Sequence, residues 1–268
     1  MLIAGIILAV LFLLYFLCLR GRRKNPELEG LRGWSYAHRG LHKKGVPENS
    51  MAAFKLAVIK GYGIELDLHL MADGNVAVIH DHSLLRTTGK EGIIEDLTLR
   101  DLHNYPLEGT NETIPTLREV LHLVRGRVPL ILEFKTHLKN AHKLGAAVFE
   151  LLEDYEGDYC VESFDPLCVF WLKRFQPEVV RGQLSANYVR NKKLKSWLAR
   201  WIATCNLGNF LTTPDFIAYE FSGRKTLSNF LTRHIWGVQG VSWTLKTQEE
   251  YEKAVQEGWI PIFEGFEP

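Results

Sequence analysis

Apolar and polar positions follow one another along this chain in two patterns, as short extended runs and as longer runs with helical spacing. The short apolar runs predict strands, and apolar positions three and four residues apart predict helices. Strands are expected at residues 34–38, 64–69, 129–135, 159–164, 179–184, 216–219, 240–245 and 260–263. Helices are expected at 50–60, 116–125, 137–155, 166–175, 225–234 and 248–257. Eight strands that alternate with helices predict an α/β fold, a (β/α)8 or TIM barrel.

The second expected strand continues into a hairpin pattern. Residues 65–83, ELDLHLMADGNVAVIHDHS, contain two alternating runs around an Asp-Gly pair at 73–74. An Asp-Gly pair is typical of a two-residue hairpin loop, and counting back from that loop pairs Asp67 with His80. The loop-rich stretch that follows indicates a small insertion in the barrel, at about residues 71–115.

The amino-terminal residues are the clearest compositional break. Residues 2–19 carry no charge, and their number is close to the ~20 that a helix needs to cross a bilayer. No basic segment precedes them and no A-x-A site follows, which disfavours a cleaved signal peptide. Basic residues follow at once: Arg20, Arg22, Arg23 and Lys24. The pattern predicts a transmembrane anchor at 1–20, a single-pass membrane protein and, by the positive-inside rule, a cytoplasmic catalytic domain.

The remaining chain divides into a basic and polar linker at 21–33 and a barrel domain at 34–268. Of the 268 residues, 46% are hydrophobic and 24% charged, an ordinary globular balance. The formal net charge of +1 argues against nucleic acid as a partner. Four cysteines without a CxxC spacing argue against a disulfide framework or a zinc knuckle.

Three acidic residues follow apolar strand positions. Glu65 and Asp67 are two residues apart in an extended run, so both carboxylates point to one face. Glu133 lies near the carboxyl end of the next barrel strand, where the active sites of such barrels lie. Three oxygen ligands without cysteine favour a divalent cation, Mg²⁺ or Ca²⁺. The alternative is that each carboxylate pairs with a basic residue, as Glu133 does with Lys135 on its own face.

Two histidines complete this group. His38 ends the first expected strand and His80 ends the returning arm of the hairpin, so both can reach one cavity. Such a pair can act as general acid and general base, and Arg39 and Lys135 add positive charge suited to a phosphate group. The other histidines receive a structural interpretation by default, namely His42, His69, His82, His103, His122 and His137.

Four motifs in this order resemble those of the glycerophosphodiester phosphodiesterase family: AHRG at 37–40, PENS at 47–50, IELDLHLMADGNVAVIHD at 64–81 and LILEFKT at 130–136. The SF at 163–164 and VSWT at 241–244 match weaker positions of the family, and the resemblance runs from Trp34 to about Thr247. It implies a TIM barrel with a small insertion after the second strand. The sequence departs from the family at its last strand, which reads IPIFEGFEP and is followed by no eighth helix.

The resemblance implies His38 and His80 as the catalytic acid and base, and Glu65, Asp67 and Glu133 as ligands of a divalent cation. Arg39 and Lys135 would bind phosphate, with Glu48 lining the site. Trp243, at a strand end, has two readings, since it can contact the substrate or pack in the core.

A basic segment at 191–211 has tryptophans at helical spacing, including Trp197 and Trp201. It either lies on a membrane surface or is an ordinary barrel helix with its tryptophans in the core. The predicted activity is metal-dependent hydrolysis of glycerophosphodiesters to an alcohol and glycerol phosphate, in lipid metabolism. Two alternatives remain: a lysophospholipase D-like hydrolase on the same scaffold, and a catalytically inactive, membrane-tethered lipid-binding domain.

Overall fold

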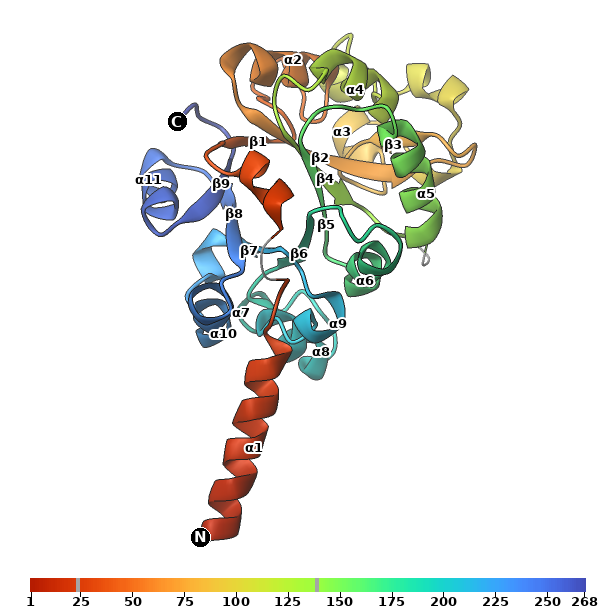
Figure 1. Ribbon diagram of the computed structural model, residues 1–268. Helices are drawn as coiled ribbons and strands as arrows, with labels where there is room; N and C mark the ends of the chain where they lie inside the picture. The colour runs from red at the N-terminus through yellow and green to blue at the C-terminus, as the bar shows by residue number, and fades with distance from the viewer. Residues whose placement is uncertain (23–24, 138–139) are drawn as a thin grey trace.

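Eight parallel strands close into a barrel in the computed structural model, which describes residues 1–22, 25–137 and 140–268 (Figure 1). The predicted TIM barrel is therefore confirmed. Closure occurs where β1 pairs with β2 on one side and with β9 on the other. The strands are β1 (Tyr36–His38), β2 (Gly63–Leu70), β4 (Leu130–Phe134), β5 (Tyr159–Ser163), β6 (Arg181–Ser185), β7 (Phe216–Glu220), β8 (Gln239–Leu245) and β9 (Trp259–Phe263).

Helices cover the outside of the barrel. They are α2 (Met51–Lys60), α4 (Leu117–Val124), α5 (Ala141–Leu152), α6 (Pro166–Phe175), α7 (Tyr188–Asn191), α8 (Trp197–Thr204), α9 (Asn209–Thr212), η5 (Phe221–Gly223), α10 (Leu227–Phe230), η6 (Leu231–Ile235) and α11 (Gln248–Gln256). Ser50 caps α2 and Thr116 caps α4, as expected for hydroxyls at helix starts. Within the helix expected at 137–155, Leu138 and Lys139 lie outside the described residues.

Alternation along the strands separates two environments. On β2, Ile64, Leu66 and Leu68 point outward into the main core between barrel and helices. Near the amino ends, the opposite face of the strands fills the barrel interior with apolar side chains such as Ile131, Phe216 and Val241. The carboxyl ends of the same strands carry charged groups instead. The interior is therefore apolar at one end and polar at the other, and the polar end is the mouth.

The hairpin after β2 has a different register from the predicted one. β3 (Val76–Val78) pairs with β2 so that His69 lies opposite Ala77. The loop therefore has three residues, with Gly74 in the left-handed region at φ +85° and its N–H donating to the Met71 carbonyl. The predicted pairing of Asp67 with His80 is wrong by one residue, since the Asp67 carbonyl accepts from the N–H of Ile79. A one-residue shift turns side chains to the other face of the strand.

The segment after β3 forms a small layer beside the barrel. It contains α3 (Leu85–Thr88), η2 (Ile94–Asp96), η3 (Leu99–Asn104) and η4 (Leu107–Gly109). These elements share a core of their own, built from Met71, Ala77, Ile79, Leu84, Ile94, Leu102, Leu107 and Ile114. The hairpin contributes to both this core and the main one, which fixes the segment to the rim of the barrel.

The amino-terminal helix corrects the transmembrane prediction. α1 (Leu2–Cys18) has 17 residues, which at ~1.5 Å per residue is about 25 Å, short of the ~30 Å of a bilayer core. Among the described residues, no helix reaches the length and apolarity required to span a membrane. The predicted transmembrane anchor and single-pass location are therefore wrong, and with them goes the basis for the predicted orientation; membrane attachment through this helix is not supported. The apolar run was misleading because Leu19 at its end is buried against the barrel.

The end of α1 is held by the barrel's outer helices. The Trp236 indole N–H donates to the Phe16 carbonyl at 2.9 Å, and the two rings lie 4.9 Å apart. The Asn209 amide donates to the Leu19 carbonyl at 3.4 Å. From this contact α1 projects away from the barrel (Figure 1).

Residues between α1 and β1 close the amino end of the barrel. Arg23 and Lys24 lie outside the described residues, but Arg22 donates to the Asp215 carboxylate from two nitrogens, at 2.5 and 2.8 Å. A short helix, η1 (Pro26–Leu31), follows and buries Leu28 and Leu31 among the interior residues of the barrel. This stretch, expected as a linker, is thus packed into the fold.

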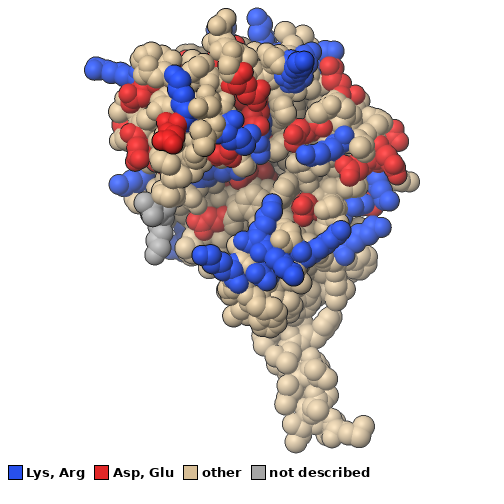
Figure 2. Space-filling model, turned by 180° about the vertical axis from the view of Figure 1, so that it is seen from behind, with Lys and Arg blue, Asp and Glu red and all other residues tan. Residues whose placement is uncertain are grey.

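The basic segment before β7 does not bury its tryptophans. Trp197 is 73% exposed and Trp201 43% exposed on α8, so core packing is the wrong interpretation for both. Figure 2 shows Lys and Arg side chains gathered in a band above the apolar α1, with acidic and basic groups mixed over the rest of that face. The near-zero net charge therefore conceals an uneven distribution.

Candidate active site

Three buried carboxylates meet at the mouth of the barrel. Glu65, Asp67 and Glu133 can each place an oxygen so that all three lie within 4.8 Å of one another. The strand register explains this, because Asp67 lies directly opposite Glu133 and Glu65 is two residues back on the same face. All three are at most 6% exposed. The alternation seen in the sequence therefore brings these side chains to one place.

Two basic side chains reach the same carboxylates. The Lys135 ammonium lies 2.6 Å from Glu133 Oε1 and 2.9 Å from Asp67 Oδ1. Arg39 Nε lies 3.4 Å from Asp67 Oδ2, and the backbone N–H of Arg39 donates to Glu65. The alternative considered from the sequence, in which each carboxylate forms an ion pair with a basic residue, is thus partly correct. However, three carboxylates face two cations, and one of these cations is shared with Glu48.

Because of this imbalance, the pKa values of the three carboxyl groups shift in different directions. Burial and the charge of Asp67 raise the pKa of Glu65 well above its ordinary value. Burial raises the pKa of Glu133 to about 7, although Lys135 opposes it. Burial also acts on Asp67, but Lys135, His80 and Arg39 outweigh it and hold the pKa of Asp67 below its ordinary value. A further positive charge among the three would allow all of them to ionise.

His38 is oriented by a carboxylate that the sequence did not single out. Its Nδ1 lies 2.9 Å from Glu264 Oε2, and its Nε2 lies 3.9 Å from Glu65 Oε2. Burial lowers the pKa of His38, while the hydrogen bond with Glu264 raises it. With Nδ1–H donating to Glu264, Nε2 of the neutral ring carries no proton.

His80 is also oriented by a carboxylate. Its Nδ1 lies 2.5 Å from Asp81 Oδ1, and Arg86 holds the second oxygen of that carboxylate. Burial lowers the pKa of His80, and the charge of Asp67 raises it. The charges of both His38 and His80 act on Asp67, so the structure brings both histidines to the carboxylate cluster.

The turn after β1 explains the His-Arg-Gly sequence. Arg39 adopts a left-handed conformation at φ 56°, which is uncommon outside glycine and marks backbone held by its surroundings. Gly40 follows at φ 78°, and a Cβ there would lie 2.9 Å from atoms of Ala53 and Phe54. Glycine therefore allows the loop to rest on α2. Asn49, also left-handed, donates its side-chain amide to Asp67 at 2.8 Å.

Glu48 and Trp243, two residues predicted to line the substrate site, differ in how far their polar groups are hydrogen-bonded. Glu48 accepts hydrogen bonds from Arg39 at 2.9 Å and from Arg86 at 2.7 and 3.0 Å, so it joins the two guanidinium groups and fixes Arg39. Trp243 packs edge-on against Phe164, with ring centroids 5.6 Å apart. Its buried indole N–H has no acceptor within the described part of the chain.

Sequence reasoning missed three residues of this site. Glu162 lies opposite Glu133 on β5, is 1% exposed, and burial raises its pKa well above the ordinary value. Its position on the inward face of an expected strand was a signal that could have identified it. Asp81 closed the quoted motif at 64–81 without a role, although its carboxylate orients His80. Glu264 gave no local signal, because it follows the last strand and meets His38 only when the barrel closes.

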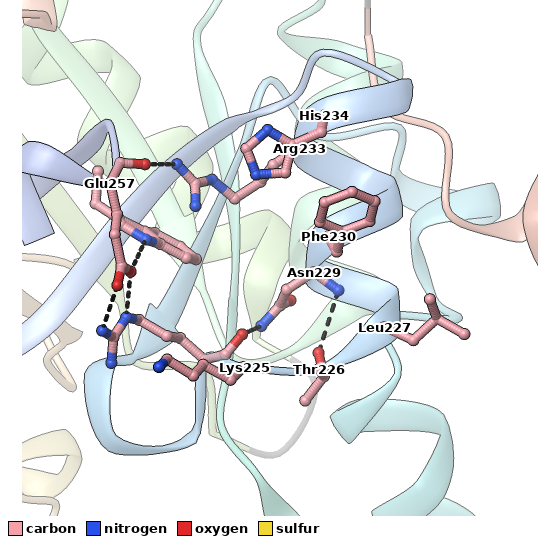
Figure 3. Close-up of a pocket in the computed structure, with 10 residues that line it drawn as sticks. Lys225, Thr226, Leu227, Asn229, Phe230, Arg233, His234 and Glu257 are labelled. Atoms are coloured by element: carbon pink, nitrogen blue, oxygen red, sulfur yellow. Dashed lines mark hydrogen bonds and ion pairs between the residues drawn. The ribbon is translucent and has the colours of Figure 1, made fainter.

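A second cavity, of about 520 Å³, lies away from this mouth between α10 and the start of β9, and Figure 3 shows the residues that line it. Glu257 accepts hydrogen bonds there from Arg224 at 2.7 and 2.8 Å, and the Arg233 guanidinium donates to its main-chain carbonyl. The Arg224 guanidinium and the Glu257 carboxylate neutralise each other in this cavity. It contains none of the residues singled out above and serves to tie α10 to the strand edge.

We expect Glu264→Gln to lower kcat by about 10²–10⁴-fold without unfolding the protein, because His38 would lose the carboxylate that orients its ring. Loss of that charge also lowers the pKa of His38, so the acidic limb of the kcat/KM profile should move to lower pH. A pH–rate profile measures both effects. Glu267→Gln, which removes a surface partner of Lys60, is the control. An unchanged acidic limb in Glu264→Gln would contradict the positioning role.

The fold and the mouth together define a class, the TIM-barrel phosphoric diester hydrolases. A family model described as the glycerophosphoryl diester phosphodiesterase family matches residues 38–263. The chain therefore belongs to this family, as the sequence motifs indicated.

Relatives and solved structures agree with this assignment. The chain is 43% identical over 165 residues to a glycerophosphodiester phosphodiesterase of Bacillus altitudinis, covering 58% of this chain and 67% of the relative. It is 34% identical over 158 residues to one of Caldanaerobacter subterraneus, covering 55% of this chain and 65% of that relative. The match thus spans about two thirds of each relative. A phosphodiesterase of Oleispira antarctica, solved with the product sn-glycerol-3-phosphate, has the same fold, with a TM-score of 0.72, 24% identity and coverage of 86% and 92%.

Proposed function

We propose that this chain hydrolyses glycerophosphodiesters to an alcohol and glycerol phosphate, in lipid metabolism, with a divalent cation at Glu65, Asp67 and Glu133. The observation that carries the proposal is the convergence of these carboxylates with two carboxylate-oriented histidines at one mouth. The names of the relatives, and the product complex of the Oleispira enzyme, support this substrate class.

The donor set fits a hard divalent cation. All three groups offer carboxylate oxygens, which Mg²⁺ and Ca²⁺ prefer. The raised pKa values of Glu65 and Glu133 indicate that positive charge is in deficit at this point. When bound, a cation would supply positive charge against the phosphate oxygens and the charge that develops on them. This fit favours a metal site over a set of simple ion pairs.

The chain's own residues would perform the proton transfers. One histidine, for which we favour His38, accepts a proton at Nε2 from the attacking hydroxyl, of water or of the substrate. His80 donates a proton to the leaving alcohol as the phosphorus–oxygen bond breaks. Glu264 and Asp81 hold the two rings in position. Arg39 and Lys135 would orient the phosphate, and the Trp243 indole N–H, which has no acceptor among the described residues, would donate to a substrate oxygen.

A second candidate substrate has one observation in its favour. An apolar cavity of about 380 Å³ adjoins the carboxyl ends of β5 and β6 and is lined by Leu184, Tyr188, Leu194 and Ile202, among others. Besides burial, the charge of Glu133 raises the pKa of Tyr188, which places this cavity close to the carboxylates. A single acyl chain fits such a lining, as in a lysophospholipid. The comparisons do not favour this alternative.

One experiment tests the function and separates the two substrates. The purified chain is assayed for alcohol release from glycerophosphodiesters with choline, ethanolamine, glycerol and inositol groups, and from lysophosphatidylcholine, with Mg²⁺, Ca²⁺ or a chelator. We expect turnover of at least one soluble diester, and its loss on chelation. Turnover of lysophosphatidylcholine alone would favour the acyl-chain alternative. No turnover of any diester with excess cation would favour the inactive binding domain.

A further inference from the structure

A second cluster of metal-binding side chains lies outside the carboxylate centre. His82, Glu95 and His137 can each place a ligand atom so that all three lie within 4.8 Å of one another. They come from three separate places: His82 follows β3, Glu95 lies in η2, and His137 follows β4. From the sequence we expected only a structural role for His82 and His137, because they are 55 residues apart and form no local motif.

The contacts within this cluster are close. His82 Nδ1 lies 2.5 Å from Glu95 Oε2, and the rings of His82 and His137 stack with centroids 4.4 Å apart. The His137 ring contacts His82 by this stacking, and it makes no hydrogen bond with any described residue. Two imidazoles and a carboxylate therefore converge, while one imidazole has free capacity to bind.

The carboxylate in this cluster is already oriented. Glu95 is 13% exposed at its side chain, and its Oε1 lies 2.7 Å from Nδ1 of the buried His69. His69 Nε2 in turn lies 3.2 Å from the main-chain carbonyl of His80. Carboxylate ligands of metals are commonly held in this way by a hydrogen bond from behind. The arrangement leaves Oε2 directed at His82.

The donor set selects a different metal from the one at the mouth. Two histidines and one carboxylate suit Zn²⁺ and related borderline cations, whereas the all-carboxylate centre suits Mg²⁺ or Ca²⁺. His82 is 42% exposed at its side chain, so the site opens to solvent and leaves a fourth position for water. A metal here would connect three parts of the chain that lie far apart in the sequence.

We propose that His82, Glu95 and His137 form a zinc site, separate from the carboxylate centre, that fastens the segment after β3 to the barrel beside His80. Two ligands belong to that segment and the third to the loop after β4, which also carries Lys135. A bound ion therefore links the loop of one predicted catalytic histidine to the loop of a predicted phosphate ligand. The site acts as a brace at the rim and takes no part in the reaction.

The test is zinc binding by the full chain. After chelator treatment and dialysis against Zn²⁺, metal analysis should find one zinc ion more per chain in the wild type than in His82→Ala or His137→Ala. His122→Ala, which removes an exposed histidine of α4, should retain the wild-type amount. At zinc about 100-fold above its Kd, the wild-type Tm should rise by about 5–10 °C more than that of either variant.

Cobalt provides a spectroscopic test of the proposed site in the wild-type protein itself. Co²⁺ in a site of this donor set gives visible d–d absorption of low-coordinate geometry, which we expect in the wild type and in Glu65→Gln. Absence of that absorption in the wild type would overturn the proposal. Equal zinc content in the wild type and His137→Ala would also overturn it. Loss of the zinc ion in Glu65→Gln, with retention in His137→Ala, would assign it to the carboxylate centre instead.

Discussion

Replacing either His38 or His80 with alanine should lower kcat by about 10²–10⁴-fold, the usual contribution of a positioned general acid or base. The two residues lie on different loops, and each ring is held by its own carboxylate, Glu264 or Asp81. Neither belongs to the group of three carboxylates that would bind the cation. Cation binding should therefore survive in both variants while turnover is lost.

Steady-state kinetics and calorimetric titration of the cation measure these two properties on the same protein. His122→Ala on the exposed face of α4 is the matched control and should keep both. The pH profile adds a check on the roles. If His38 is the base, the acidic limb of kcat/KM should disappear from the residual activity of His38→Ala and persist in that of His80→Ala. Near-normal turnover in either alanine variant would rule out the paired mechanism.

The second large effect is expected for Glu65→Gln, which should lose cation-dependent activity by about 10²–10⁴-fold, equivalent to several kcal/mol of transition-state stabilisation. The same variant should be more stable than the wild type without metal. The reason is that burial and the charges of Asp67 and Glu133 act against ionisation of Glu65, so the neutral amide removes an unfavourable charge. Activity and metal-free stability should thus change in opposite directions.

The pH dependence follows from the same carboxyl groups. The folded-state pKa of Glu65 is raised, and that of Glu133 is about 7, both above the ordinary value of a glutamate. Their favourable contribution to folding is therefore complete below about pH 4.5 and is lost as pH rises through the raised folded-state pKa values, about 7 for Glu133. Thermal unfolding of the metal-free protein should show this decline. Saturating cation should abolish it, because the ionised carboxylates then have a partner.

Glu162→Gln is the matched variant for this experiment. It removes an equally buried carboxylate on the neighbouring strand, and its charge also acts on Glu65. We expect higher metal-free stability here too, but with cation binding retained, since Glu162 lies outside the three-carboxylate group. Equal loss of cation affinity in both variants would show that charge, and not ligation by Glu65, is decisive.

The barrel and its carboxylates could be predicted because both depend on local periodicity. A period of two on β2 places Glu65 and Asp67 on one face whatever the rest of the chain does. The positions of the strands follow from apolar runs between turn residues, and all eight were located within a few residues. The motif order then indicated the family.

Other features depend on information that a local pattern does not contain. An Asp-Gly pair serves a two-residue loop or a three-residue loop with glycine in the left-handed region, and the choice sets the hairpin register. Glu264 reaches His38 only through the pairing of β9 with β1, two elements at opposite ends of the chain. The apolar run at residues 2–19 was interpreted by length, whereas packing of Leu19 on the barrel decides where the free helix ends.

The short helix η1 determines where a folded fragment of this protein can begin. The Tyr36 hydroxyl donates to the Leu31 carbonyl at 2.9 Å, so the first strand and η1 are joined as well as packed. A fragment that began at Trp34 would lack Leu28 and Leu31 and would expose the apolar floor of the barrel to water. Asp215, which also accepts from the Arg181 N–H, would lose its guanidinium partner Arg22. We therefore expect the smallest fragment that folds alone to start no later than Arg22, because residues at the amino end of the barrel support the strands that carry the mouth at the other end.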